Sequence, residues 1–146
     1  MTERTTDAAV VLTVPATAEQ LALLRALIGY YAGREQFTID QIDDLKMAVD
    51  EAGVQLLRHA SGDTVRLEIT RVAAGIAVRV SADVPPGAAL IDESTFSWAI
   101  LAALTDELDV ERTDGQAAVL LVKHQLEGIP APQADDDAIA GGQVQG

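Results

Sequence analysis

Apolar residues recur at intervals of three and four along three stretches of the chain, which is the spacing of a helix that buries one face. The first stretch follows Pro15, the second runs from about residue 38 to residue 60, and the third begins near Ser94. The three apolar stripes are Leu21, Leu24, Ile28 and Tyr31; Ile42, Leu45, Val49, Ala52 and Leu56; and Phe96, Ile100, Leu104 and Leu108. We therefore predict three amphipathic helices, each with one face in the core.

The residues at the predicted helix starts have side chains that can bond free backbone N–H groups. Thr17 with Gln20, and Thr38 with Gln41, have the spacing of a capping box. Ser94 is the expected cap of the third helix. The first two helices should therefore each begin with a reciprocal pair of side-chain hydrogen bonds.

Five further segments have the patterns of strands. Residues 8–14 form an apolar run rich in β-branched side chains, and residues 65–69 and 76–80 alternate apolar with mostly polar positions. Asp114-Gly115 is a hairpin signal between the segments 108–113 and 116–122. The order β-α-α-β-β-α-β-β predicts an α+β fold, a two-layer α/β sandwich with three helices on one face of a mostly antiparallel sheet.

Length and composition indicate one domain with flexible ends. A chain of 146 residues with 49% apolar residues can bury a core, and the absence of cysteine excludes disulfides and thiolate metal sites. Residues 1–7 are polar and should be flexible, residues 8–126 form the domain, and residues 127–146 should be a disordered acidic tail. No apolar run suggests a signal peptide or a membrane span, so we expect a cytoplasmic protein.

The charge balance indicates the kind of partner. With 10 basic and 23 acidic residues the formal net charge is −13. This excess argues against direct binding to nucleic acid, which requires a cationic face, and it favours attraction to basic partners. The chain has two histidines, no cysteine and no other clustered ligands, which argues against a metal site built from histidine or cysteine side chains.

The second predicted helix contains the most informative motif of the chain. Glu51 and Gln55 lie four residues apart, so both project from one helix face, outside the apolar stripe. The simplest interpretation is two solvated positions beside the stripe. The surrounding residues favour a second interpretation, because the segment 44–60 contains Asp44, Lys46, Ala48, Val49, Glu51 and Ala52 and ends in His59-Ala60.

This segment resembles the first motif of the GHKL ATP-binding superfamily, and specifically that of its RsbW-like branch of anti-sigma-factor serine/threonine kinases. The family motif reads roughly D-x-K-x-A-V-x-E-A-x-x-N, so Gln55 stands where the family has asparagine. The resemblance implies that Glu51 is a general base and that residue 55 holds Mg²⁺ against the nucleotide. Gln55 has the same amide oxygen on a longer arm, which makes it a displaced candidate ligand. The predicted element order is also that of the GHKL fold, from about residue 8 to residue 126.

The other nucleotide motifs of the family are altered here. The D-x-G-x-G motif corresponds to Asp83 through Gly87, which keeps Asp83 and Gly87 as candidate nucleotide contacts but has Pro85 at the first glycine. A proline turn with a solvated Asp83 is the alternative. The Gly-rich phosphate clamp is replaced by the segment 94–98, and Asp92 and Glu93 beside it would repel phosphate. Trp98 belongs either to the core or to a contact surface.

Two functions compete on this evidence. In the first, the chain is an anti-sigma factor that sequesters an alternative sigma factor and is released by an anti-anti-sigma (STAS-type) antagonist, with binding of ATP and Mg²⁺ weak or absent. In the second, it is an active serine/threonine kinase that phosphorylates that antagonist. An unrelated acidic binding module is a third interpretation. The resemblance implies a homodimer and a sigma contact through the first helix, where Arg25 is the candidate; a solvated charge is the alternative.

Overall fold

Three α-helices and five strands follow one another in the predicted order. The computed structural model describes residues 8–88 and 92–126. The elements are β1 (Val10–Pro15), the short 3₁₀ helix η2 (Ala18–Gln20), α1 (Leu21–Gly33), α2 (Ile39–His59), β2 (Thr64–Val72), β3 (Gly75–Asp83), α3 (Phe96–Leu104), β4 (Glu107–Thr113) and β5 (Gln116–His124). The predicted flexible N-terminus 1–7 and acidic tail 127–146 lie outside the described residues.

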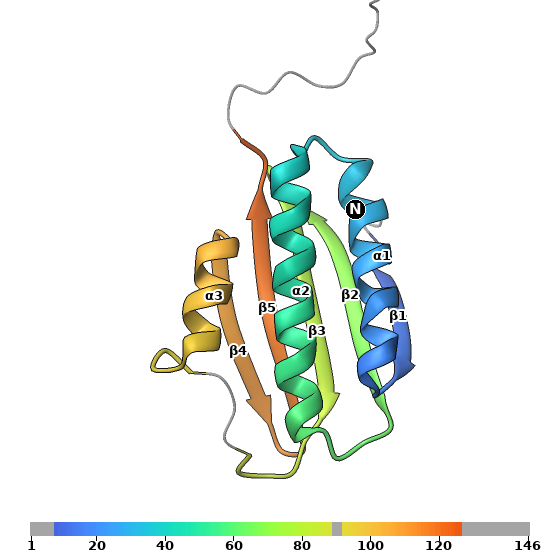
Figure 1. Ribbon diagram of the computed structural model, residues 1–146, viewed down its shortest axis with the longest axis vertical. Coiled ribbons are helices and arrows are strands. Elements are labelled where there is room, and N and C mark those ends of the chain that lie inside the picture. The colour runs from blue at the N-terminus through green and yellow to red at the C-terminus, as the bar shows by residue number, and fades with distance from the viewer. Residues whose placement is uncertain (1–7, 89–91, 127–146) are drawn as a thin grey trace, which may run out of the picture.

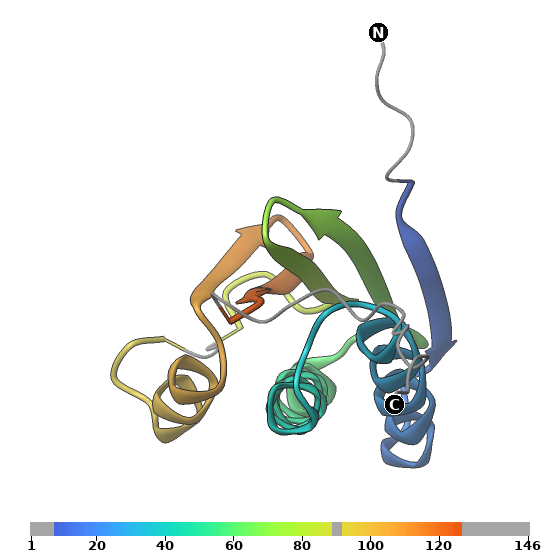
Figure 2. The ribbon, with the colours of Figure 1, turned by 90° about the horizontal axis from the view of Figure 1, so that it is seen from above.

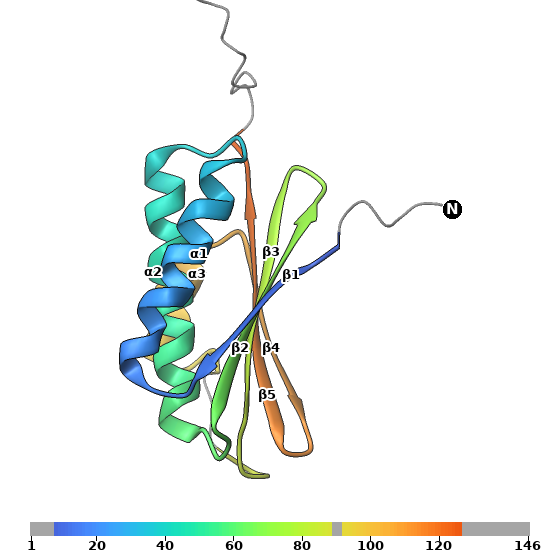
Figure 3. The same ribbon diagram turned by 90° about the vertical axis from the view of Figure 1, so that its right-hand side faces the viewer.

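The strands form one sheet that is covered by helices on one face only. The strand order is β1-β2-β3-β5-β4, and each neighbouring pair is antiparallel. All three α-helices lie on the same side of this sheet, with α2 over its middle and α1 and α3 toward its two edges (Figures 1 and 3). The predicted α+β two-layer sandwich is confirmed, and every strand pairing among the described residues is antiparallel.

The core lies between the helices and the covered face of the sheet. Along β2, Val65, Leu67 and Ile69 are fully buried, whereas Arg66 between them is exposed, so the predicted alternation is confirmed. The stripe on α2 is equally well buried at Leu45, Val49, Ala52 and Leu56, and only Ile42 is partly exposed. The central helix is therefore fixed against the sheet by its apolar face, which decides where its polar face points.

The packing of α1 against α2 requires a glycine. A Cβ atom built on Gly53 of α2 would lie 2.7 Å from Leu21 Cδ2 of α1, which is closer than such atoms approach. Leu21 is buried at this contact. Gly53, which lies between Glu51 and Gln55 in the sequence, therefore lets the two helices approach closely, and a side chain there would require Leu21 to shift.

The caps differ between the first two helices. Thr38 and Gln41 form the predicted capping box at the start of α2, and the Gln41 amide also donates to the carbonyl of His124 at the end of β5, at 2.8 Å. Thr17 makes no side-chain cap bond, so that part of the prediction is wrong. A 3₁₀ turn intervenes before α1, and the Gln20 N–H instead donates to the backbone carbonyl of Thr17.

The third helix is shorter than its apolar pattern predicts. It ends at Leu104, and Leu108 lies in β4. Its face also differs, because Phe96 is 82% exposed and Leu101 is the buried residue. Thr95 caps the helix by accepting from the Trp98 N–H, in place of Ser94. The helix has only nine residues, so its apolar pattern is a weak signal. Its contact with α2 therefore decides which of its residues are buried.

Candidate functional site

Glu51 and Gln55 lie together on the half-buried flank of α2 and contact one another. The Gln55 amide nitrogen donates to Glu51 Oε2 at 3.1 Å. The i, i+4 spacing thus places the two side chains in contact, and a hydrogen bond within one helix joins them. Both side chains are partly buried and contact each other, so neither is simply a solvated position beside the stripe.

Ser97 of α3 is a third member of this site, and sequence analysis missed it. Its hydroxyl donates to the same oxygen, Glu51 Oε2, at 2.6 Å. This is a short hydrogen bond to an ionised acceptor, the stronger kind of hydrogen bond in proteins. No local pattern relates residue 97 to residue 51, because the contact depends on how α3 packs on α2.

This three-residue network limits what the site can do. Glu51 Oε2 already accepts from two donors, so a nucleophile would have to use the other oxygen or displace Ser97. The Gln55 nitrogen is engaged, which leaves a single amide oxygen as its ligand atom for a metal. Mg²⁺ prefers several short oxygen contacts in octahedral geometry. The network thus offers a bound Mg²⁺ one amide oxygen, and water and nucleotide phosphate would have to supply the other ligands.

Two matching positions of the helix motif have structural roles. Lys123 of β5 is nearly buried, donates to the carbonyl of Leu104 at 2.8 Å and lies 3.4 Å from Asp44 Oδ2. Asp44 thus connects α2 to the end of α3 through Lys123. The Lys46 side chain lies over Gly29 of α1. The contacts of Lys123 help to orient α2 and α3 relative to one another, whereas the contact of Lys46 is with α1.

Asp83 lies at the exposed end of β3, against the loop that follows α2. Its carbonyl accepts from the Ser61 N–H at 2.8 Å, and its carboxylate lies so close to Gly62 that a Cβ there would be 3.0 Å from Oδ2. The structure thus places Asp83 beside the end of α2. Its predicted contact with a nucleotide stays a prediction.

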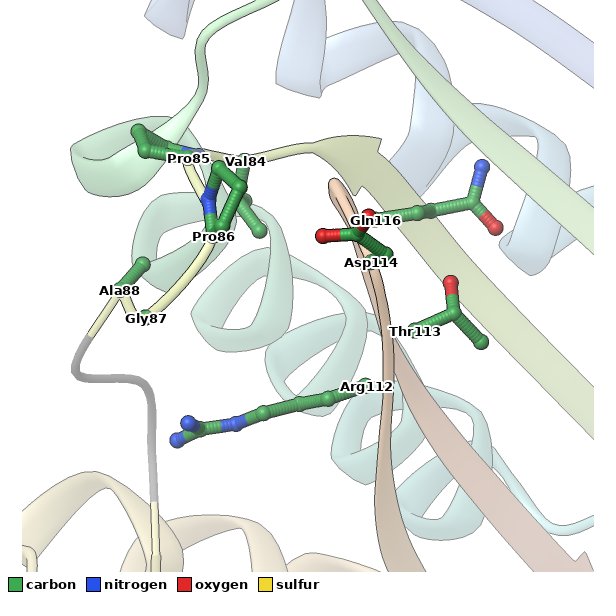
Figure 4. Close-up of a pocket in the computed structure, with 9 residues that line it drawn as sticks. All are labelled: Val84, Pro85, Pro86, Gly87, Ala88, Arg112, Thr113, Asp114 and Gln116. Carbon is green, nitrogen blue, oxygen red and sulfur yellow. The ribbon is translucent and has the colours of Figure 1, made fainter.

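Gly87 lies in a different setting, a small pocket beside the hairpin of β4 and β5. The pocket has a volume of about 110 Å³. Figure 4 shows the rings of Pro85 and Pro86 on one side of it and the Arg112 side chain extending below Gly87. Gly87 has φ of +82°, which favours glycine in this turn. Neither Glu51 nor Asp83 lines this pocket, so the structure does not bring Gly87 together with the other candidates.

The start of α3 is acidic. The hydroxyl and N–H of Ser94 both donate to Asp92, and these bonds hold the pKa of Asp92 below its usual value. Asp92 thus stays ionised near the N–H groups that a phosphate clamp would use. Trp98 packs partly on the core and lines an open cleft of about 380 Å³ with three acidic residues and Arg112. A place for Trp98 on a contact surface stays a prediction.

Arg25 lies on α1, away from this network. It forms an ion pair with Asp50 of α2, and both side chains are about two-fifths exposed. Arg25 is therefore partly exposed, and α2 engages its guanidinium. Its role in binding a partner stays a prediction.

Neither a metal site nor a membrane segment is found in residues 8–88 and 92–126. No group of three histidine or acidic residues there could hold a metal ion. No helix in the same residues is long and apolar enough to cross a membrane.

Fold and motif positions together define a histidine kinase-like domain. A family model described as "Histidine kinase-like ATPase domain" matches residues 14–123. The chain belongs to this family. The resemblance to the GHKL superfamily, first suggested by the segment around Glu51, is thereby confirmed.

Individual relatives agree with the RsbW-like branch. The anti-sigma-F factor RsbW of Mycobacterium tuberculosis is 38% identical over 107 residues, which are 68% of this chain and 60% of that protein. The serine-protein kinase RsbW of Bacillus cereus is 24% identical over 136 residues, which are 80% of this chain and 85% of that protein. The chain thus spans about 60% of the length of the first of these relatives.

A solved structure supports the fold. The structure of the RsbU and RsbW domains of a Mycobacterium tuberculosis protein matches with a TM-score of 0.64 at 15% identity. The match covers 80% of this chain and 32% of that one. At this identity the likeness concerns the arrangement of helices and strands alone.

Proposed function

We propose that this chain is an anti-sigma factor. It sequesters an alternative sigma factor in the cytoplasm as a homodimer, and an anti-anti-sigma (STAS-type) antagonist releases the sigma factor. Binding of ATP and Mg²⁺ is weak or lost. The observation that carries the proposal is the 107-residue match, at 38% identity, to a protein named anti-sigma-F factor. The net charge of −13 adds support, since it favours a basic partner.

The geometry of the nucleotide motifs supports weak or absent ATP binding. The amide of Gln55 and the carboxylate of Glu51 bond to each other, and Ser97 occupies the space in front of Glu51. Pro85 removes a backbone donor where the family has glycine. Asp92 and Glu93 add negative charge beside the start of α3. Together these departures weaken the contacts to phosphate, disturb the coordination of Mg²⁺ and hinder close approach of the backbone to the nucleotide.

The outer surface of α1 and α2 supports a protein contact. Arg25 and Asp50 form a half-exposed ion pair there, and Met47 of α2 is 57% exposed nearby along the helix surface. Exposed apolar groups next to charged pairs are common at protein interfaces. We assign the sigma contact to this surface and to the neighbouring loops.

The test is a binding measurement with purified sigma factors and with Mg-ATP. We expect Arg25→Glu to weaken sigma binding at least about tenfold, which corresponds to about 1.4 kcal/mol. Arg66→Glu is the matched control, because it changes the net charge equally but lies on the uncovered face of the sheet. Mg-ATP should bind with a dissociation constant weaker than about 1 μM.

Three results would count against the proposal. The first is the absence of binding to any sigma factor of the same cell. The second is an equal effect of Arg25→Glu and Arg66→Glu on sigma binding, which would show that the assigned surface is not the sigma contact. The third is tight binding of Mg-ATP in calorimetry, which would show that the nucleotide site is functional.

An active kinase is the second candidate, because Glu51 is present and relatives carry the name serine-protein kinase. If this chain transfers phosphate to the antagonist, Glu51→Ala should reduce the rate by roughly 10²- to 10⁴-fold. Sigma binding should persist in the same variant, since Glu51 contacts Ser97 of α3, whereas the assigned surface is at the pair of Arg25 and Asp50. Transfer that continues at the parental rate would exclude Glu51 as the base.

A further inference from the structure

The sheet has one face that no described helix covers. All three α-helices lie on the other side of the sheet, as the view from above shows (Figure 2). The side chains of the uncovered face are those that alternate with the buried positions of β2, β3 and β5. This face is therefore available for a further contact.

A groove of about 230 Å³ lies on this face, over the three central strands. Two rows of side chains that cross these strands line it: Thr70, Ala77 and Val122 in the first row, and Glu68, Arg79 and Leu120 in the second. Ala77 has the shortest side chain of the six and lies between two larger ones, which leaves a hollow. We call this site the open-face groove. Its first row is mostly apolar, and its second row adds a pair of opposite charges.

Two arginines lie at the charged end of the open-face groove. The guanidinium groups of Arg66 and Arg79 lie 3.6 Å and 3.5 Å from the carboxylate of Glu68, so the two cations share one anion. Arg79 also lies 3.8 Å from Glu111. Positive and negative charges therefore balance here, whereas the whole chain has a formal charge of −13. Arg66 is half exposed, so its guanidinium can donate to a further carboxylate.

The chain leaves the sheet at the opposite, apolar end of the groove. Strand β5 ends at His124, and the Gln125 N–H donates to the carbonyl of Ala74, in the turn between β2 and β3, at 2.7 Å. Residues 127–146 follow and lie outside the described residues. Successive rows on one face of a sheet are about 7 Å apart, so the groove lies within about 15 Å of the end of β5, and Arg66 within about 20 Å.

The sequence after Leu126 has the complementary chemistry in the same order. It contains the apolar run Ile129-Pro130-Ala131-Pro132 and then the acidic run Asp135-Asp136-Asp137. Proline fixes its own φ and restricts the residue before it to extended conformations, so such a run loses little conformational entropy on binding. Each extended residue spans about 3.4 Å, so the apolar run can reach the groove and the acidic run can reach the two arginines.

We propose that the open-face groove binds the C-terminal segment of the same chain. The apolar run of residues 129–132 lies across the first row at Ala77, and the carboxylates of residues 135–137 face Arg66 and Arg79. The contact buries apolar side chains of a segment whose composition provides no core of its own. It is an interaction in addition to the proposed function and does not rest on it.

The size of the groove favours a tethered segment over a separate protein. A stable complex between two proteins buries about 1,200–2,000 Å², whereas a groove of about 230 Å³ receives only a few side chains. A segment of the same chain needs a smaller contact, because a short link gives it an effective concentration on the order of millimolar. A basic partner would gain little at a site where the charges balance.

Disulfide formation in the full chain tests this contact, because the chain contains no native cysteine. Under mild oxidation, Ala77→Cys combined with Ala131→Cys should form an intramolecular disulfide, detected by mass spectrometry. Ala102→Cys combined with Ala131→Cys is the matched control. Ala102 is exposed on α3, whose end contacts β5 through Lys123, but it lies on the covered side of the sheet. The first pair should close at least about tenfold faster than the second, at a rate independent of chain concentration.

Substitutions within the segment separate its apolar and acidic parts. In the first cysteine pair, Ile129→Asp should slow closure at least about fivefold, because it removes the apolar anchor. Ile139→Asp makes the same change beyond the acidic run and should leave the rate unchanged. Replacing residues 135–137 by asparagine should slow closure about threefold at low salt and less at high salt, because salt screens the attraction to the arginines.

Three results would overturn the inference. The first is equal closure of the pairs at Ala77 and Ala102, which would show that the segment does not prefer the groove. The second is closure that does not change with Ile129→Asp or with the asparagine replacements. The third is a rate that rises with chain concentration, which would show that another copy supplies the segment. No sigma factor or nucleotide enters these measurements, so their outcome is independent of the proposed function.

Discussion

Glu51 shows how one contact from outside a helix changes the chemistry of a motif. Within α2 it has a carboxylate on the same face as Gln55, as a general base beside a metal ligand would. The hydroxyl of Ser97 donates a hydrogen bond to that carboxylate at 2.6 Å. The motif thus serves here to hold α3 on α2, in addition to any role with a ligand.

This contact predicts a loss of stability in Ser97→Ala. A hydrogen bond to a charged group contributes roughly 1.5–3 kcal/mol, and the half-buried setting places the expected loss at the low end, about 1.5 kcal/mol. Urea unfolding of the parent and the variant measures it. Ser94→Ala is the control, because its bonded partner Asp92 is fully exposed, and it should change stability by less than about 0.5 kcal/mol. Equal losses of stability in both variants would show that the bond between Ser97 and Glu51 contributes no more than the exposed bond between Ser94 and Asp92.

At the scale of whole elements, the start of α2 is better fixed than the start of α1. The Thr38 hydroxyl accepts from the Gln41 N–H, and Gln41 returns a bond to the Thr38 N–H while reaching the end of β5. Thr17 has a similar sequence context but no cap bond. The first turn of α2 is thereby joined to the end of β5.

Two threonine variants compare these helix starts. Thr38→Ala should lower the free energy of unfolding by about 1 kcal/mol, the usual cost of losing an N-cap side chain. Thr17→Ala should change it by less than about 0.5 kcal/mol, since no side-chain cap bond is lost. Thermal or urea unfolding measures both. A larger effect at Thr17 than at Thr38 would contradict the assigned caps.

The whole molecule is dominated by its negative charge. The formal charge of −13 attracts a basic partner before contact. The proposed homodimer differs, because it joins two chains of like charge that repel one another. We therefore expect two kinds of association, one guided by charge and one by apolar burial.

Salt should separate these two kinds of association. Raising the ionic strength from about 0.05 M to 0.5 M shortens the screening length from above 10 Å to a few ångströms, and should slow sigma association roughly tenfold. The homodimer should hold or tighten, because salt also screens the repulsion between like chains. Stopped-flow mixing and light scattering measure the two. A sigma association rate that does not change with salt would contradict the role assigned to charge.

The sequence by itself determined the elements, because their signals are local. Residues three and four apart specify the buried face of α2, alternation specifies β2 and β3, and Asp114-Gly115 specifies the turn where Gly115 adopts a φ of +81°. The fold class followed from the order of these elements. The local signals failed at Thr17 and in α3, where weak patterns were overridden by a 3₁₀ turn and by contact with α2.

Only the tertiary structure decided the site and the edges of the sheet. Ser97 and Glu51 lie 46 residues apart, and no local pattern encodes a contact at that separation. The order β1-β2-β3-β5-β4 likewise made β1 an edge strand beside the exposed side of α1. Local sequence specifies which face of an element is apolar, but the element that covers that face depends on the free energy of packing the whole chain.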